Sequence, residues 1–197
     1  MIERLLEKTI LEKLPKGKII VLVGPRQVGK TTLLKSVLQK RGKRALFWNC
    51  DEPDIREILQ NATSTRLKNL AGNAELIIID EAQRIKDIGI TIKLMAENFS
   101  GVQVAVTGSS ALEFSNSINE YMLSPLSCGE LCRYYGTLEE KRLLKGRLIY
   151  GAYPEIVTKP EEKRELPENI VSSYLFKDVF VFQDMRKSDT EPIAKVC

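Results

Sequence analysis

A glycine-rich segment that could bind phosphate stands early in the chain. It consists of Gly24, Pro25, Arg26, Gln27, Val28, Gly29, Lys30, Thr31 and Thr32. The apolar run 19–23 before it predicts a buried strand and the pattern of 33–38 after it predicts a helix, so the segment joins the two. There, backbone N–H groups and the helix N-terminus can surround phosphate oxygens. We expect the whole segment to bind nucleotide, with Lys30 reaching the β- and γ-phosphates as a catalytic residue and the Thr31 hydroxyl binding Mg²⁺.

Two acidic residues end a second apolar run. Residues 76–79 read Leu-Ile-Ile-Ile, as expected of a strand buried on both faces of a parallel sheet, and Asp80 and Glu81 follow directly. Asp80 would hold Mg²⁺, directly or through water, together with Thr31. Glu81 would polarise the water that attacks the γ-phosphate, which makes it the expected catalytic base.

A third apolar run, 102–106, ends in small hydroxyl residues. Thr107, Ser109 and Ser110 follow it, with a glycine at position 108. A hydroxyl at this point could bond the attacking water or the γ-phosphate, and so report whether that phosphate is present. Thr107 and Ser109 both suit this sensing role, and we take Ser109 as the third catalytic residue.

The order of these segments favours ATP hydrolysis. A whole strand, 45–49, lies between the loop helix and the acidic strand, and the strand over 102–106 comes next. This order, with a glutamate beside the aspartate, is typical of hydrolases that carry their own catalytic glutamate. No Asn-Lys-x-Asp motif for reading guanine occurs in the chain, so ATP is the expected nucleotide.

Composition predicts a globular cytoplasmic protein. The 197 residues support one sizeable core with a small helical addition, and no apolar run approaches the roughly 20 residues of a membrane helix, so we expect no membrane partner. The net charge of +4 does not by itself argue for nucleic acid, which stays open as a partner. The four cysteines are expected to be reduced thiols, and the absence of histidine removes Ser-His and Cys-His mechanisms.

The remaining pattern predicts further helices and one more strand. Residues 1–14 carry an apolar stripe at helical spacing, which we expect to pack on the core. Residues 111–120 predict a short helix or a mobile loop, and a fifth strand is expected over 122–126. Ser127 and Glu130 have the spacing of a capping box that opens a helix. Other helices are expected over 53–60, 63–71, 85–99, 137–145 and 167–187.

Taken together, these segments resemble an ATPase of the AAA superfamily from bacteria or archaea. The chain is most similar to the branch whose ATPase domain is followed by a C-terminal domain of unknown function. The segments that carry the resemblance are 24–32, 76–85, 107–110, 124–127, 148–155 and 174–179. The resemblance implies an α/β fold: a P-loop NTPase three-layer sandwich with a mainly parallel five-stranded sheet, plus a small helical subdomain. It also implies ATP and Mg²⁺ as cofactors, with Lys30, Thr31, Asp80 and Glu81 in the roles given above.

The chain departs from this branch in two ways. Members often carry a Gly-Arg pair shortly before the Pro-Leu-Ser segment, and none stands between Ser110 and Pro125. AAA enzymes commonly take an arginine from a neighbouring subunit, which implies a homo-oligomer, and Arg133 and Arg147 are the candidates here. Arg26 could contact the γ-phosphate or brace the loop against Asp51.

The second departure concerns the end of the chain. We expect an ATPase core over 1–135 and a helical appendage over 136–197, cut before a further C-terminal domain.

Three functions remain open at this point. The first is a Mg-dependent ATPase that hydrolyses ATP to ADP and phosphate, as a switch acting on an unidentified protein partner or on the further domain. The second is a DNA-associated ATPase or remodelling motor, since residues 80–83 resemble the acidic box of some helicases; the chain, however, has room for one motor domain. The third is a nucleotide-binding module without hydrolysis, against which the intact Glu81 argues.

Overall fold

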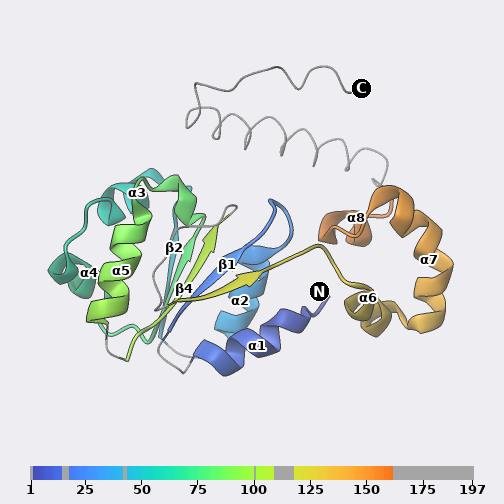
Figure 1. Ribbon diagram of the computed structural model, residues 1–197, viewed down its shortest axis with the longest axis horizontal. Coiled ribbons are helices and arrows are strands. Elements are labelled where there is room, and N and C mark those ends of the chain that lie inside the picture. Colours follow the sequence, from blue (N-terminus) through green and yellow to red (C-terminus); the bar gives the residue numbers. More distant parts are fainter. Residues whose placement is uncertain (1, 15–17, 42–43, 100, 109–117, 162–197) are drawn as a thin grey trace, which may run out of the picture.

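The computed structural model describes residues 2–14, 18–41, 44–99, 101–108 and 118–161 (Figure 1). The strands are β1 (Ile19–Val23), β2 (Ala45–Asn49), β3 (Leu76–Asp80), β4 (Gln103–Gly108) and β5 (Ile118–Met122). The helices are α1 (Leu5–Lys13), α2 (Lys30–Arg41), α3 (Pro53–Leu59), α4 (Ser64–Ala71), the 3-10 turn η2 (Ala82–Arg84), α5 (Ile88–Asn98), α6 (Cys128–Tyr135), α7 (Thr137–Tyr150) and α8 (Pro154–Thr158).

The five strands form one parallel sheet. Their order is β2-β3-β4-β1-β5, and every neighbouring pair runs in the same direction. Strand β4 therefore lies between β1, which precedes the glycine-rich loop, and β3, which ends at Asp80. The predicted parallel five-stranded sheet is confirmed, and the carboxyl ends of all three strands meet at one edge.

Helices cover both faces of the sheet, which makes three layers (Figure 1). Alternate residues of β1 show this division, because successive side chains of a strand point to opposite faces. Ile20 and Leu22 belong to the apolar cluster shared with α1 and α2, while Val21 and Val23 belong to the cluster shared with α3, α4 and α5. Since both faces are covered, every residue of β1 is buried.

The N-terminal helix packs on the core, as its apolar stripe predicts. Ile10 and Leu14 are buried in the cluster beneath α1 and α2. Glu7 is also buried, and its carboxylate accepts a hydrogen bond from the Ser36 hydroxyl and pairs with Lys40 at 3.1 Å. Polar and apolar contacts thus join α1 to α2.

The fifth strand was predicted over 122–126, and that range is wrong. In the structure it is β5, Ile118–Met122, which lies beside β1 at the edge of the described sheet and has no buried residue. An edge strand can carry polar residues such as Asn119 and Glu120, so its apolar pattern is weak. The more apolar segment after it contains Pro125, which has no N–H to donate to a neighbouring strand.

Helices α6, α7 and α8 form a helical unit beside the sheet (Figure 1). The predicted capping box is confirmed: the side chains of Ser127 and Glu130 each bond the other's backbone N–H. Helix α7 continues five residues beyond the predicted 137–145, and α8 was not predicted. The unit has its own small apolar cluster, made of Ile2, Leu126, Leu131 and Val157.

Some predictions fall outside the described residues. These are the helix over 167–187 and residues 111–117 of the segment expected as a short helix or mobile loop. That expectation is wrong for the rest of the segment, because residues 118–120 begin β5. Within the described part of the chain, no helix combines the length and hydrophobicity needed to cross a bilayer.

Gly24 gives a direct test of the packing between the loop and β5. Its φ is +153°, and a Cβ at this position would lie 2.3 Å from the backbone oxygen of Leu123. The Leu123 backbone cannot move aside as easily as the end of a flexible side chain could. We therefore expect Gly24→Ala to lower the free energy of unfolding by roughly 1–3 kcal/mol. Gly146→Ala in α7 is the control: among the described residues outside its own helix, nothing lies within 4 Å of its Cβ position, and alanine favours the helix. Denaturant unfolding of both variants measures the difference; equal stability of the two would contradict this account.

Glu130 predicts a pH dependence for the attachment of α6. Burial alone would raise the pKa of this carboxyl, but hydrogen bonds from the Ser127 and Leu5 amides and from Arg4 outweigh it, and the net pKa is lowered. A lowered pKa stabilises the fold above the unfolded value, about 4.3, and this contribution is lost as the pH falls through the folded pKa. We expect the stability difference between wild type and Glu130→Gln to be constant near neutral pH and to shrink below about pH 4.3.

Unfolding at a series of pH values measures this difference. Glu139→Gln is the control, because Glu139 forms an exposed pair with Arg142 and should contribute little at any pH. A difference for Glu130→Gln that grows on acidification would contradict the prediction.

Candidate functional site

The glycine-rich loop leaves β1 and enters α2 at Lys30. Three features define the shape of its backbone. Gly24 passes under the Leu123 carbonyl, Gln27 has a positive φ of 59°, and Gly29 has a φ of +96°. Val28 is fully buried in the cluster with α1 and α2, so the middle of the loop is anchored in the core. No acidic residue stands in the first turn of α2, which leaves the positive end of its dipole facing the loop.

Lys30 lies inside the loop that it follows. Its Nζ donates hydrogen bonds to the carbonyl oxygens of Gly24 and Pro25, both at 2.8 Å, and the residue is 4% exposed. The ammonium group is thereby held at the mouth of the loop, where phosphate oxygens would also be its partners.

Thr31 and Asp80 meet across the strand that separates them. The Thr31 hydroxyl donates to Asp80 Oδ2 at 2.8 Å and to Oδ1 at 3.0 Å. Asp80 is 4% exposed, so its carboxylate is a buried acceptor at the end of β3. The structure thus brings the two expected metal ligands into direct contact.

Thr107 lies beneath the two acidic residues, at the end of β4. Its hydroxyl donates to Asp80 Oδ1 and accepts the backbone N–H of Glu81 at 2.9 Å. The residue is fully buried, so it positions the acidic turn from below. Ser109, the preferred sensing residue, lies outside the described residues.

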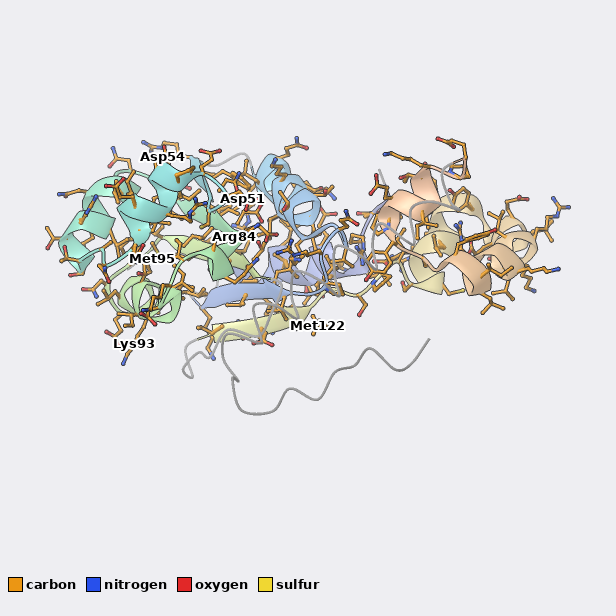
Figure 2. All side chains as sticks on the ribbon, turned by 90° about the horizontal axis from the view of Figure 1, so that it is seen from above. Asp51, Asp54, Arg84, Lys93, Met95 and Met122 are labelled. Carbon is orange, nitrogen blue, oxygen red and sulfur yellow. The ribbon has the colours of Figure 1, made fainter. Side chains whose placement is uncertain are left out.

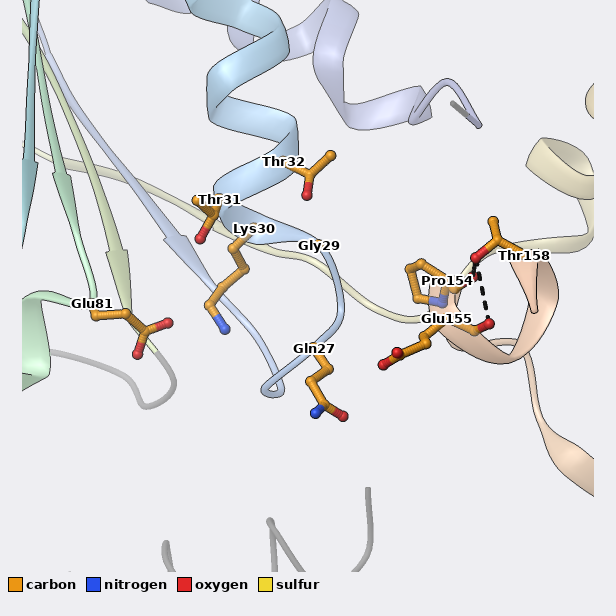
Figure 3. Close-up of a pocket in the computed structure, with 9 residues that line it drawn as sticks. All are labelled: Gln27, Gly29, Lys30, Thr31, Thr32, Glu81, Pro154, Glu155 and Thr158. Atoms are coloured by element: carbon orange, nitrogen blue, oxygen red, sulfur yellow. Dashed lines mark hydrogen bonds between the residues drawn. The ribbon is translucent and has the colours of Figure 1, made fainter. Parts of the chain in front are cut away.

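Glu81 turns away from the strand in a left-handed conformation. Its φ and ψ are 55° and 41°, and its carboxylate accepts a hydrogen bond from the side-chain amide of Gln83. Figure 3 shows Lys30 and Glu81 pointing toward the same space beside the loop. The left-handed turn directs the Glu81 side chain into this space, while Asp80 stays in the sheet.

Cys50 is buried beside the acidic edge of the site. Its backbone N–H donates to the Asp80 carbonyl at 2.9 Å. Burial, followed by the charges of Asp80 and Asp51, raises the pKa of the Cys50 thiol to about 12. This thiol therefore stays protonated at neutral pH and takes no part as a nucleophile.

A cavity of about 330 Å³ lies at the mouth of the loop (Figure 3). One wall comes from the loop, the start of α2 and Glu81. The other wall comes from α8, through Pro154, Glu155 and Thr158. The wall formed by α8 was not predicted from the sequence, although the segment 148–155 is one of those that carry the family resemblance.

A second cavity, of about 460 Å³, adjoins the first and shares Gly29, Thr32, Pro154 and Thr158 with it. It reaches the N-terminal segment and includes apolar side chains from three parts of the chain, Ile2, Leu33 and Leu126. The two cavities together extend from the phosphate loop to the junction between α2 and the helical unit.

The arginines named from the sequence have different surroundings. Arg147 pairs with Glu140 at 3.1 Å and lies over the Tyr135 ring, whereas Arg133 is exposed on α6. Asp51, named as a brace for Arg26, forms an ion pair with Arg84, Nε to Oδ1 at 3.0 Å, and both residues are labelled in Figure 2. The bracing role of Arg26 and the arginine supplied to a neighbouring subunit stay predictions.

Two solved structures with TM-scores above 0.5 share the fold of this chain. A Walker-type ATPase of Pyrococcus abyssi shares 12% identity, with 94% of this chain and 76% of that chain covered, at a TM-score of 0.57. A signal transduction ATPase with numerous domains and a tetratricopeptide repeat sensor, from Pyrococcus horikoshii, shares 15% identity at a TM-score of 0.52, with 78% and 28% covered. A DNA replication initiation factor shares 18% identity at 0.46, with 71% and 49% covered. The chain thus spans about half or less of the length of the latter two.

Comparison with protein families gives the identity of the larger part of the chain. No curated protein matches it. The profile of a family described as an AAA domain matches residues 16–132, a range that includes the glycine-rich loop, the acidic strand β3 and the start of α6. The five-stranded parallel sheet with its covering helices is the P-loop NTPase fold of the solved neighbours. The chain belongs to this family of AAA domains.

Proposed function

We propose that this protein binds ATP with Mg²⁺ and hydrolyses it to ADP and phosphate. The hydrogen bond between Thr31 and Asp80 carries the proposal, because it joins the start of α2 to the end of β3 at the mouth of the loop. Lys30 lies beside it, held by the loop carbonyls, and Glu81 points into the same cavity. Phosphate binding, metal binding and activation of water each have a residue of suitable chemistry at this point.

The donor set at this junction fits Mg²⁺. Mg²⁺ prefers hard oxygen ligands and is commonly bound by one or two carboxylates or hydroxyls together with substrate phosphates. The Thr31 hydroxyl and the Asp80 carboxylate provide such oxygens, and Thr107 holds the carboxylate in place from below. When bound, the ion would neutralise charge on the β- and γ-phosphates.

Each remaining residue then has a defined part in the reaction. The loop N–H groups and Lys30 bind the phosphates, and Lys30 stabilises the charge that develops on them. Glu81 orients a water molecule and takes its proton as the water attacks the γ-phosphate. Gln83 holds the Glu81 carboxylate, and we keep Ser109 as the residue that senses the γ-phosphate.

The second cavity supports an adenosine as the rest of the ligand. It continues from the phosphate loop and presents apolar side chains from Ile2, Leu33 and Leu126, which suit the face of a purine ring. Glu3 in the same lining offers an exposed carboxylate, which suits the exocyclic amino group of adenine, whereas the Glu7 carboxylate is held by Ser36 and Lys40.

The output of the cycle would be a change in the helical unit. Pro154, Glu155 and Thr158 face the cavity, so a bound triphosphate would contact α8 as well as the loop. We propose a switch of this kind, acting on an unidentified protein partner or on a further C-terminal domain in the cytoplasm. We also propose that the ATPase core ends at residue 135 and that the protein forms a homo-oligomer. Nucleic acid stays open as a partner.

Binding of Mg·ATP and Mg·ADP to the purified chain tests the proposal. We expect Glu81→Gln to bind Mg·ATP as tightly as wild type but to turn it over at least about 100-fold more slowly, because the base is lost. The Lys30→Ala variant should bind both nucleotides far more weakly than wild type, since the cation at the mouth of the loop is removed. Lys93→Ala and Glu97→Gln on α5 are controls of matched type, an exposed pair 4.0 Å apart.

Isothermal titration calorimetry and phosphate release measure these effects. Binding that does not depend on Mg²⁺ or on Lys30 would contradict the proposed site. Tight Mg·ATP binding with no phosphate release, in wild type at any protein concentration, would instead favour a nucleotide-binding module.

Thr107 provides a separate test of how the acidic turn is positioned. Thr107→Val keeps the shape of the side chain but removes the partner of the Glu81 N–H and one donor to Asp80. We expect a loss of about 1–3 kcal/mol in the free energy of unfolding and a fall of about 10- to 100-fold in ATP turnover, because Glu81 is displaced. Thr91→Val is the control: it removes a buried hydroxyl that bonds the Leu59 carbonyl, away from the site. A normal rate in Thr107→Val would show that the hydroxyl has no part in catalysis.

A further inference from the structure

Arg4 joins three parts of the molecule at the edge of the proposed nucleotide site, where it also lines the second cavity. Its Nη1 donates to the carbonyl oxygen of Val28 in the phosphate loop at 2.8 Å. Its Nη2 donates to the carbonyl of Ser124, on the connection from β5 to α6. Its Nε pairs with Glu130 Oε1 at 3.0 Å, on α6 itself. All three nitrogens of the guanidinium group therefore have acceptors, each in a different segment.

Glu130 ties the same junction together from the side of the helical unit. Its Oε1 also accepts the Leu5 N–H at 2.8 Å, and its Oε2 accepts the Ser127 N–H at 2.8 Å. The side chains of Arg4 and Glu130 are only 9% and 5% exposed. A buried ion pair with this many partners is sensitive to displacement, since moving either member leaves a buried charge unpaired.

The contact with the loop is placed where a bound nucleotide would act. Val28 directly precedes Gly29, and its side chain is fully buried. The Val28 carbonyl therefore moves only if this part of the loop moves as a whole. On the other side, α6 packs against α7, and the Tyr135 hydroxyl donates to the Val157 carbonyl in α8 at 3.1 Å. A chain of direct contacts thus runs from the loop through Arg4 to the helix that forms the second wall of the cavity.

We propose that Arg4 is a positioning residue that couples the state of the phosphate loop to the position of α6, α7 and α8. The inference rests on the proposed function, because the loop must bind nucleotide for the coupling to be used. When phosphate orders the loop, Arg4 and Glu130 hold the helical unit in place, with Pro154, Glu155 and Thr158 facing the ligand. Without this link, the state of the loop would reach α6 only through α8, where Pro154, Glu155 and Thr158 line the same cavity as the loop.

Hydrogen–deuterium exchange of the whole chain, with and without Mg·ADP, tests the coupling. We expect Arg4→Met to exchange faster than wild type in both the loop, 24–30, and α6, 128–135, before any nucleotide is added. In wild type, Mg·ADP should slow exchange in both segments, whereas in Arg4→Met it should slow exchange in the loop alone. The affinity for Mg·ADP should fall about tenfold in the variant, a change of about 1.4 kcal/mol.

Arg41 gives a matched control for the N-terminal attachment. Its Nη2 donates to the Leu11 carbonyl at 3.0 Å, so it also joins the N-terminal helix to the core, but it touches neither the loop nor α6. Arg41→Met should leave Mg·ADP affinity and exchange in α6 unchanged. Arg4→Lys keeps one cation beside Glu130 without the fork of donors, and should give intermediate exchange rates.

Different results separate a failed coupling from a failed function. Unchanged exchange of α6 in Arg4→Met without nucleotide would overturn the link, and so would slowing of α6 by Mg·ADP to the wild-type extent. Weaker binding with unchanged exchange would also overturn it, because Arg4 would then contact the nucleotide directly. If wild type fails to bind Mg·ADP, the proposed function fails, while the exchange of α6 without nucleotide still decides whether Arg4 holds the two parts together.

Discussion

The position of β4 between β1 and β3 is the constraint on which the site depends. Neighbouring strands in a sheet lie about 4.8 Å apart, so the ends of β1 and β3 are separated by roughly 10 Å. The loop and the first turn of α2 cross this distance, and the Thr31 hydroxyl meets Asp80 above the end of β4. Thr107, on the intervening strand, fills the place beneath them. A different strand order would leave the lysine and the acidic residues in separate places.

The loop itself is held by the sheet and by the core. Gly24 lies under the backbone of Leu123, and the Leu123 N–H donates to the Val23 carbonyl at 2.8 Å. Val28 is anchored among apolar side chains at the other side of the loop. A loop fixed at both points needs little rearrangement to receive phosphate, and preorganised donors are the ones that contribute most to stabilising charge.

Much of this site could be predicted from the sequence because its signals are local. The loop, the strand before it and the helix after it are contiguous, and the position of Asp80 at the end of an apolar run places it at the correct edge of a parallel sheet. The wrong range predicted for β5 has the opposite cause. An edge strand needs few apolar residues, so with Asn119 and Glu120 in it the segment lacks the apolar pattern of a strand. The contact between Arg4 and Glu130 joins residues 126 positions apart, and no periodicity or motif signals such a pair.

The two walls of the site differ in how firmly they are held. The wall formed by the sheet belongs to large buried clusters that include all of β1 and residues 76–79 of β3. The wall formed by α8 belongs to a unit whose cluster has few members, and Ile2 in that cluster comes from the same N-terminal segment as Arg4. Regions with fewer buried contacts open at a lower free energy than the core does. A ligand that touches both walls would therefore shift the helical unit and leave the sheet unchanged, and the N-terminal segment is the element that both walls share.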